Sequence, residues 1–113
     1  MHRSLIRTKE FDEFYDSVSC RVQEKIDYAL QILSTMPVVN TKFVKKLENT
    51  GYYELRLSAG EEYRVILFTI DNDSFMESSQ VLVLNGFKKK SVKDYKTQIA
   101  VTNRILDTLE CED

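Results

Sequence analysis

The chain has 113 residues, of which 42% are hydrophobic and 30% charged, and its formal net charge at pH 7 is −2. This composition is typical of a globular protein, excludes an intrinsically disordered chain, and suffices for one hydrophobic core. Cys20 and Cys111 form no disulfide or zinc-binding pattern, so we expect reduced thiols in a cytoplasmic protein. The longest apolar runs are too short to cross a membrane. We therefore expect one domain over residues 1–113, with no contact to a membrane.

Two helices are predicted near the N-terminus, after a short edge strand at residues 3–8. Apolar residues recur at helical spacing in both helices, and Ser17 or Ser19 marks the break between them. The apolar face of the first helix consists of Phe11, Phe14, Tyr15 and Val18, and that of the second, which ends before Pro37, consists of Val22, Ile26, Ala29, Leu30 and Leu33.

The second half of the chain is predicted to form strands and a last helix. After a lysine-rich connector at residues 38–51, three strand-like runs cover Tyr52–Leu57, Tyr63–Ile70 and Gln80–Phe87. The last element is a helix over Tyr95–Leu109, with Asp94 at its N-cap. The order β-α-α-β-β-β-α indicates an α+β fold in which the helices pack on one face of a mostly antiparallel sheet.

The first two of these long strands form a hairpin whose register we can predict. The loop lies within residues 58–62, and a loop of either three or five residues places Arg56 opposite Arg64 on one face. Directly opposed like charges cost about 0.2–1 kcal/mol, so the pair indicates a site for an anion such as phosphate. The alternative is that Glu54, on the same face, bridges both arginines in a structural group. The other face of the hairpin is apolar and carries Tyr53, Leu55, Leu57, Tyr63, Val65 and Leu67.

Lysines gather in two segments, although the net charge is slightly negative. A buried apolar strand, Val81–Leu84, leads through Gly86 and Phe87 directly into three solvated lysines, which suits the recognition of a polyanion. The alternative is that these lysines are ordinary solvated residues. The two segments contain Lys42, Lys45 and Lys46, and Lys88, Lys89, Lys90 and Lys93.

The chain offers few residues for metal or nucleophilic chemistry. The one histidine is His2, and Asp71–Asp73 begins like a calcium-binding loop but has Met76 where glycine is needed. We therefore expect neither a metal nor a cofactor. Arginine, lysine and tyrosine can cleave RNA without a metal, because the 2′-hydroxyl of the substrate is the nucleophile. A lysine or tyrosine would manage the proton if neighbouring cations lowered its pKa.

Three segments together resemble a known family: Tyr53–Leu57 (YELRL), Tyr63–Phe68 (YRVILF) and Leu84–Lys90 (LNGFKKK). They are similar to the RelE/ParE toxin superfamily, and most of all to its HigB-like branch of phage-derived proteins. The resemblance extends over nearly the whole chain. It implies an N-terminal helix pair packed on a small twisted antiparallel sheet, with a C-terminal helix. It also implies a toxin of a type II toxin–antitoxin system that cleaves mRNA on the ribosome and is neutralised by a cognate antitoxin.

The resemblance implies roles for single residues as well. Arg56 and Arg64 would hold the scissile phosphate, Lys88 or Lys89 would neutralise developing charge, and Tyr95 would stack or transfer a proton. Glu54 stands where some members of the family carry a second catalytic lysine. Two other functions remain open, namely ParE-like inhibition of a topoisomerase and a module that binds RNA or protein without catalysis. The candidate RNA-binding residues are Lys42, Lys45, Lys46, Lys90 and Lys93.

Overall fold

The computed structural model describes residues 3–110, so His2 and Cys111 lie outside the described residues. A five-stranded sheet has the order β1-β5-β4-β3-β2, in which only β1 and β5 are parallel. The elements are, in chain order, β1 (Ser4–Arg7), α1 (Lys9–Ser17), α2 (Cys20–Thr35), β2 (Val44–Lys46), β3 (Tyr53–Ala59), β4 (Glu61–Thr69), β5 (Gln80–Lys88) and α3 (Lys93–Glu110).

The two N-terminal helices form as their sequences predict. Thr8 begins α1 by accepting a hydrogen bond from the Phe11 amide, and Ser19 begins α2 in the same way. Ser19 is therefore the cap that separates the helices. The predicted apolar face of α2 is confirmed, because Val22, Ile26, Ala29, Leu30 and Leu33 are all buried.

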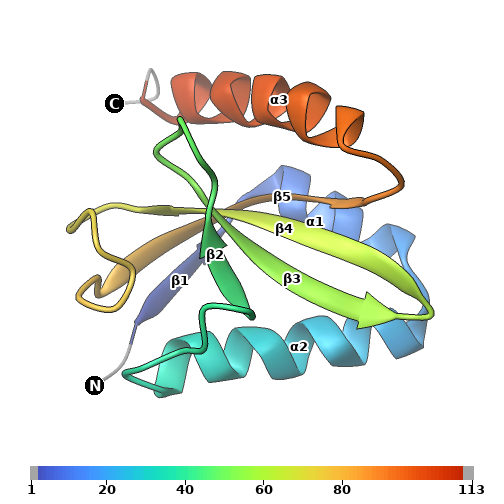
Figure 1. Ribbon diagram of the computed structural model, residues 1–113, viewed down its shortest axis with the longest axis horizontal. Coiled ribbons are helices and arrows are strands. Elements are labelled where there is room, and N and C mark those ends of the chain that lie inside the picture. The colour runs from blue at the N-terminus through green and yellow to red at the C-terminus, as the bar shows by residue number, and fades with distance from the viewer. Residues whose placement is uncertain (1–2, 111–113) are drawn as a thin grey trace.

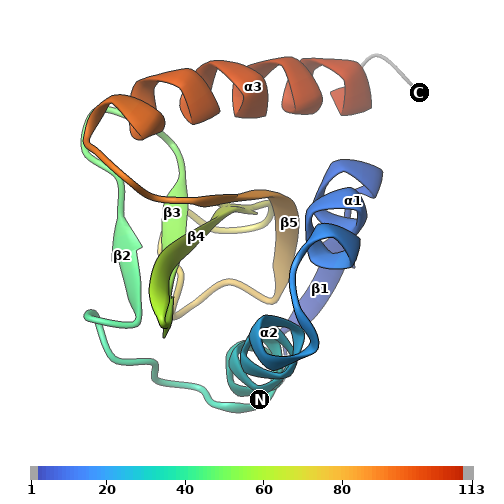
Figure 2. The same cartoon turned by 90° about the vertical axis from the view of Figure 1, so that its right-hand side faces the viewer.

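The helices cover both faces of the sheet, and the expectation of one covered face is wrong. Figures 1 and 2 show the sheet between α2 on one side and α3 on the other. The reason is that β4 and β5 are apolar on both faces. Ile66, Leu84 and Phe87 form a second core cluster with Ile105 of α3, apart from the main core under α1 and α2.

The register of the β3–β4 hairpin is confirmed. Gly60 makes the turn at a φ of +79°, in the left-handed region that glycine adopts without steric cost. Arg56 lies opposite Arg64, and the apolar side chains of the hairpin face the main core. The short strand β2 was not expected, because its three residues lie within the lysine-rich connector.

Candidate functional site

A groove of about 470 Å³ lies between the β2–β3 edge of the sheet and the beginning of α3. Four cationic and two acidic side chains line it, so its charge favours an anionic ligand. Its residues come from four parts of the chain and are Lys45, Lys46, Leu47, Glu48, Glu54, Arg56, Lys89, Val92, Tyr95 and Ile99. We call it the cationic groove.

The floor of the cationic groove holds the two opposed arginines and one carboxylate. The Nε atom of Arg56 lies 3.3 Å from Oε1 of Glu54, and Nε of Arg64 lies 3.9 Å from Oε2 of the same residue. Glu54 is 3% exposed. The carboxylate therefore does bridge the two guanidinium groups, as the structural alternative anticipated. The like-charge repulsion between the arginines is offset by this shared counter-charge.

Arg64 lies beneath the groove rather than in it. Its side chain is only 3% exposed. Its Nε donates to the Tyr95 hydroxyl at 2.9 Å, and its Nη1 donates to the carbonyl of Tyr63 at 2.8 Å and to Glu62 at 3.4 Å. These contacts use the guanidinium to fix its neighbours. The expectation that Arg64 itself meets a phosphate is therefore not supported by this geometry, and Arg56, with 36% of its side chain exposed, is the accessible arginine.

Tyr95 reaches the floor from the first turns of α3. Burial raises the pKa of the Tyr95 phenol, the neighbouring Glu54 carboxylate raises it further, and Arg64 partly opposes this shift. The phenol is therefore protonated at neutral pH and is suited to donate a hydrogen bond or a proton. The expectation that surrounding cations lower the pKa of such a group is wrong for Tyr95.

Consecutive lysines of the triple-lysine segment face in different directions. The Nζ atom of Lys89 lies 5.4 Å from the centre of the Tyr95 ring, at the cationic groove. Lys88 instead pairs with Tyr63 in the sheet register, so it shares the face of the main core, and its Nζ lies 2.5 Å from Glu61. Glu61 raises the pKa of Lys88 by hydrogen bonding and charge. Lys88 is thus separated from the arginines, because successive strand residues point to opposite faces.

The two lysines of β2 divide in the same way. Lys45 pairs with Glu54 in the register and therefore faces the cationic groove. Lys46 pairs with Tyr53, and its Nζ lies 5.8 Å from the centre of that ring on the other face, although Lys46 also borders the groove. Of this pair, Lys45 is the better placed for an anion in the groove.

The remaining predicted RNA contacts lie outside the groove. Lys42 lines a separate hollow at the end of α2. Lys90 is exposed in the segment that leads into α3, and Lys93 is exposed at the first residue of that helix. Asp94 accepts hydrogen bonds from the Lys90 and Ser91 amides. These hydrogen bonds lower the pKa of Asp94. The prediction of Asp94 as the N-cap is wrong, because α3 already begins at Lys93 and Asp94 lies within its first turn. The structure therefore does not bring Lys42, Lys90 or Lys93 to the groove.

Two parts of the cationic groove are not predicted from the sequence, namely the Glu54 carboxylate as a group of the site and the apolar wall. The sequence predicts only a structural bridge for Glu54, whose position two residues before Arg56 places it on the same face of the strand. Leu47, Val92 and Ile99 gave no signal, because a position in the groove depends on how α3 docks. Within residues 3–110 no group of three or more His, Cys, Asp or Glu side chains could hold a metal ion. No helix in that range is long and apolar enough to cross a membrane.

The fold defined by this sheet and its helices is that of the RelE toxins. The structure matches an E. coli RelE mutant in the free state, in which two arginines are replaced by alanine, with a TM-score of 0.60 and 18% identity over 85% of this chain and 93% of that chain. It matches a chain of the intact E. coli RelBE toxin–antitoxin complex with a TM-score of 0.58 and 19% identity, over 80% of this chain and 100% of that one.

A third match is to a chain of the toxin–antitoxin complex RelBE2 from Mycobacterium tuberculosis, with a TM-score of 0.56, 17% identity, and coverage of 79% of this chain and 100% of that one. No curated protein matches the sequence. The model of the family described as phage-derived protein Gp49-like (DUF891) matches residues 10–107, so the chain belongs to that family. The resemblance of the sequence to the phage-derived branch of the RelE/ParE superfamily is thereby confirmed.

Proposed function

We propose that this protein is the toxin of a type II toxin–antitoxin system and cleaves mRNA on the ribosome, in the cytoplasm. Its fold is shared with RelE chains that were solved in toxin–antitoxin complexes, which supports the toxin role. One observation carries the proposal of catalysis: Arg56, Lys89 and the Tyr95 hydroxyl converge on one groove around the Glu54 carboxylate.

The proposed reaction uses the 2′-hydroxyl of the RNA as its nucleophile. Its oxygen attacks the adjacent phosphorus while the bond from phosphorus to the 5′-oxygen breaks, which leaves a cyclic phosphate and a free 5′-hydroxyl. Arg56 and Lys89 stabilise the charge that develops on the phosphoryl oxygens, as preorganised cations do. Because DNA lacks the 2′-hydroxyl, it is not cleaved by this route.

Two protons must move in this reaction, and two groups of the groove are suited to move them. Tyr95 is held by Arg64 and remains protonated, so it supplies the proton for the leaving 5′-oxygen. The Glu54 carboxylate lines the same groove, and in the proposed scheme it accepts the proton of the 2′-hydroxyl. In this scheme Arg64 is a positioning residue for both groups.

Cleavage of mRNA on programmed ribosomes tests the proposal, with the fragment ends mapped by primer extension. We expect Arg56→Ala and Lys89→Ala each to lower the cleavage rate by about 10²–10³, the scale for losing one transition-state donor. Lys88→Ala is the matched control, because it removes the same charge from the adjacent residue on the opposite face. Equal rates for the parent, Arg56→Ala and Lys89→Ala would refute the catalytic groove.

A toxin that acts only by binding, for example on a topoisomerase, is the second candidate function. It is favoured by the bridge from Glu54 to both arginines, because this carboxylate neutralises part of the charge available to a phosphate. Mapping of mRNA ends after induction separates the two functions. Growth arrest without new mRNA ends would support the binding toxin, and new ends would support the nuclease.

A further inference from the structure

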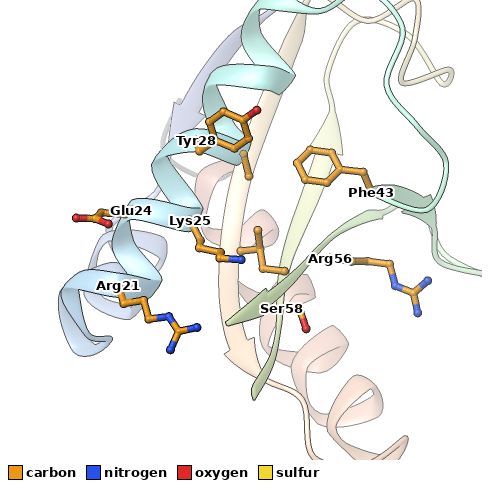
Figure 3. Close-up of a pocket in the computed structure, with 9 residues that line it drawn as sticks. Arg21, Glu24, Lys25, Tyr28, Phe43, Arg56 and Ser58 are labelled. Carbon is orange, nitrogen blue, oxygen red and sulfur yellow. The ribbon is translucent and has the colours of Figure 1, made fainter. Parts of the chain in front are cut away.

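A second groove, of about 630 Å³, lies between α2 and β3 (Figure 3), and apart from Arg56 it shares no lining residue with the cationic groove. We call it the α2–β3 groove. Arg56 borders both grooves, because its strand lies between them. The residues that line the α2–β3 groove are Arg21, Glu24, Lys25, Tyr28, Ala29, Phe43, Arg56, Leu57 and Ser58.

The charge of the α2–β3 groove favours an acidic occupant. Three of its side chains are cationic, namely Arg21, Lys25 and Arg56, and only Glu24 is acidic. In Figure 3 Lys25 extends from α2 towards β3, whereas Glu24 points away from the groove. Both cations of α2 are exposed, and neither makes an ion pair within the described residues. They are therefore available to a partner.

The walls of the same groove are apolar. They therefore favour an occupant that has apolar groups as well as negative charge, which a polyanion without apolar side chains lacks. Tyr28 is 68% exposed above the groove, and Phe43 closes its end. Beyond Phe43 a second hollow continues along α2, where Met36 and Val38 are 50% and 73% exposed. Exposed apolar side chains of this size, in two hollows that share Phe43 and are flanked by cations, fit a peptide with both acidic and apolar residues.

The strand at the edge of the groove is open for pairing. β2 pairs with β3 only from Tyr53 to Leu55, and the Arg56 amide donates to the carbonyl of Phe43. On the side away from β4, no strand of residues 3–110 pairs with Leu57–Ala59. An open strand edge takes an extended peptide through main-chain hydrogen bonds, which a nucleic acid cannot provide.

We propose that an extended acidic segment of the antitoxin docks in the α2–β3 groove and adds a strand beside Leu57–Ala59. This inference rests on the proposed function, because it assigns the site where the toxin is neutralised. Side chains of an added strand alternate between the two faces of the sheet. Those on the α2 face meet Arg21 and Lys25, and an acidic one on the other face meets Arg56. The segment thereby competes with phosphate for Arg56 without filling the cationic groove.

The test measures binding and inhibition with a defined probe, a short synthetic peptide of glutamates with a valine at every third position, so that an added strand carries glutamates on both faces. A peptide of equal length with lysine in place of each glutamate is the control for charge, and polyuridylate is the control for RNA. The variant R21E/K25E reverses both cations of the groove at exposed positions, and Lys96→Glu is the matched control on the exposed side of α3. Binding is measured by fluorescence anisotropy, and inhibition by mRNA cleavage on programmed ribosomes.

We expect the acidic peptide to bind the parent and Lys96→Glu and to inhibit cleavage by both. The R21E/K25E variant should bind it at least about tenfold more weakly and cleave mRNA without being inhibited. Equal binding by the parent and R21E/K25E, or absence of binding to the parent, overturns the proposal. Loss of polyuridylate binding in R21E/K25E also overturns it, since the groove would then be an RNA site.

The same experiment separates this inference from the proposed function. Cleavage by the parent that the peptide does not inhibit leaves the nuclease standing and refutes the docking site. Peptide binding that depends on Arg21 and Lys25, in a parent that cleaves no mRNA, refutes the nuclease and retains the peptide site for a toxin that acts by binding.

Discussion

Replacement of Arg64 by alanine tests whether the floor of the cationic groove is one coupled unit. The substitution leaves Glu54 buried with a single remaining cation, Arg56, and removes the donors to Tyr95 and to the Tyr63 carbonyl. Removal of one partner from a buried ion pair costs about 3–5 kcal/mol, because the other charge stays buried without compensation. A domain of this size has a total stability of about 5–15 kcal/mol, so we expect Arg64→Ala to be folded but strongly destabilised.

Urea unfolding, monitored by circular dichroism, measures this effect. With a slope of about 1.5 kcal/mol per molar urea, the expected loss lowers the unfolding midpoint by about 2–3 M. The double variant E54Q/R64A removes the buried charge together with its partner and should recover part of the loss, as coupled residues do. If Arg64→Ala destabilises by less than about 1 kcal/mol, or if the two single effects add without coupling, the shared-carboxylate account of the floor is refuted.

If Arg64→Ala does not fold, the same urea unfolding experiment can be made on Arg64→Lys. Lysine retains a charge near Glu54 but cannot donate to Tyr95 and the Tyr63 carbonyl from one planar group. We expect an intermediate loss of stability, of about 1–3 kcal/mol. If Arg64→Lys unfolds at the same urea concentration as the parent, the planar geometry of the Arg64 guanidinium contributes nothing to stability.

Two further predictions concern Tyr95 and Gly86. Because the fold raises the pKa of Tyr95, the folded state favours the neutral phenol. Its stabilising contribution is therefore complete below the ordinary tyrosine pKa of about 10 and is lost as the pH rises through the higher folded value. The stability difference between the parent and Tyr95→Phe should accordingly stay constant up to about pH 9 and decrease as the pH rises above about 10, and a difference that stays constant above about pH 10 would contradict this. A Cβ atom at Gly86 would lie 2.3 Å from the Phe14 ring, so Gly86→Ala should cost about 1–3 kcal/mol of unfolding free energy. Gly51→Ala is its control, because that Cβ atom meets only Phe68, at 3.8 Å; equal stability of both alanine variants would refute the steric argument.

The groove shows where strand alternation is informative and where it is not. Alternation predicts that Arg56 lies opposite Arg64, because a hairpin with a short loop has few registers, and the structure confirms it. The same alternation in the last strand separates Lys88 from Lys89. The three consecutive lysines instead indicate one cluster that follows the end of the strand at Phe87. The strand in fact continues through Lys88, so the alternation continues as well.

The helices, the long strands, the hairpin register and the pairing of the two arginines can be predicted from the sequence, since each follows from periodicity over neighbouring residues. Which of these charged groups are accessible depends instead on tertiary packing. The docking of α3 on the second face buries Arg64, brings Tyr95 to it and closes the cationic groove. Such a contact joins residues 31 positions apart, and no local pattern encodes it, because it depends on the shape and free energy of a whole packed interface.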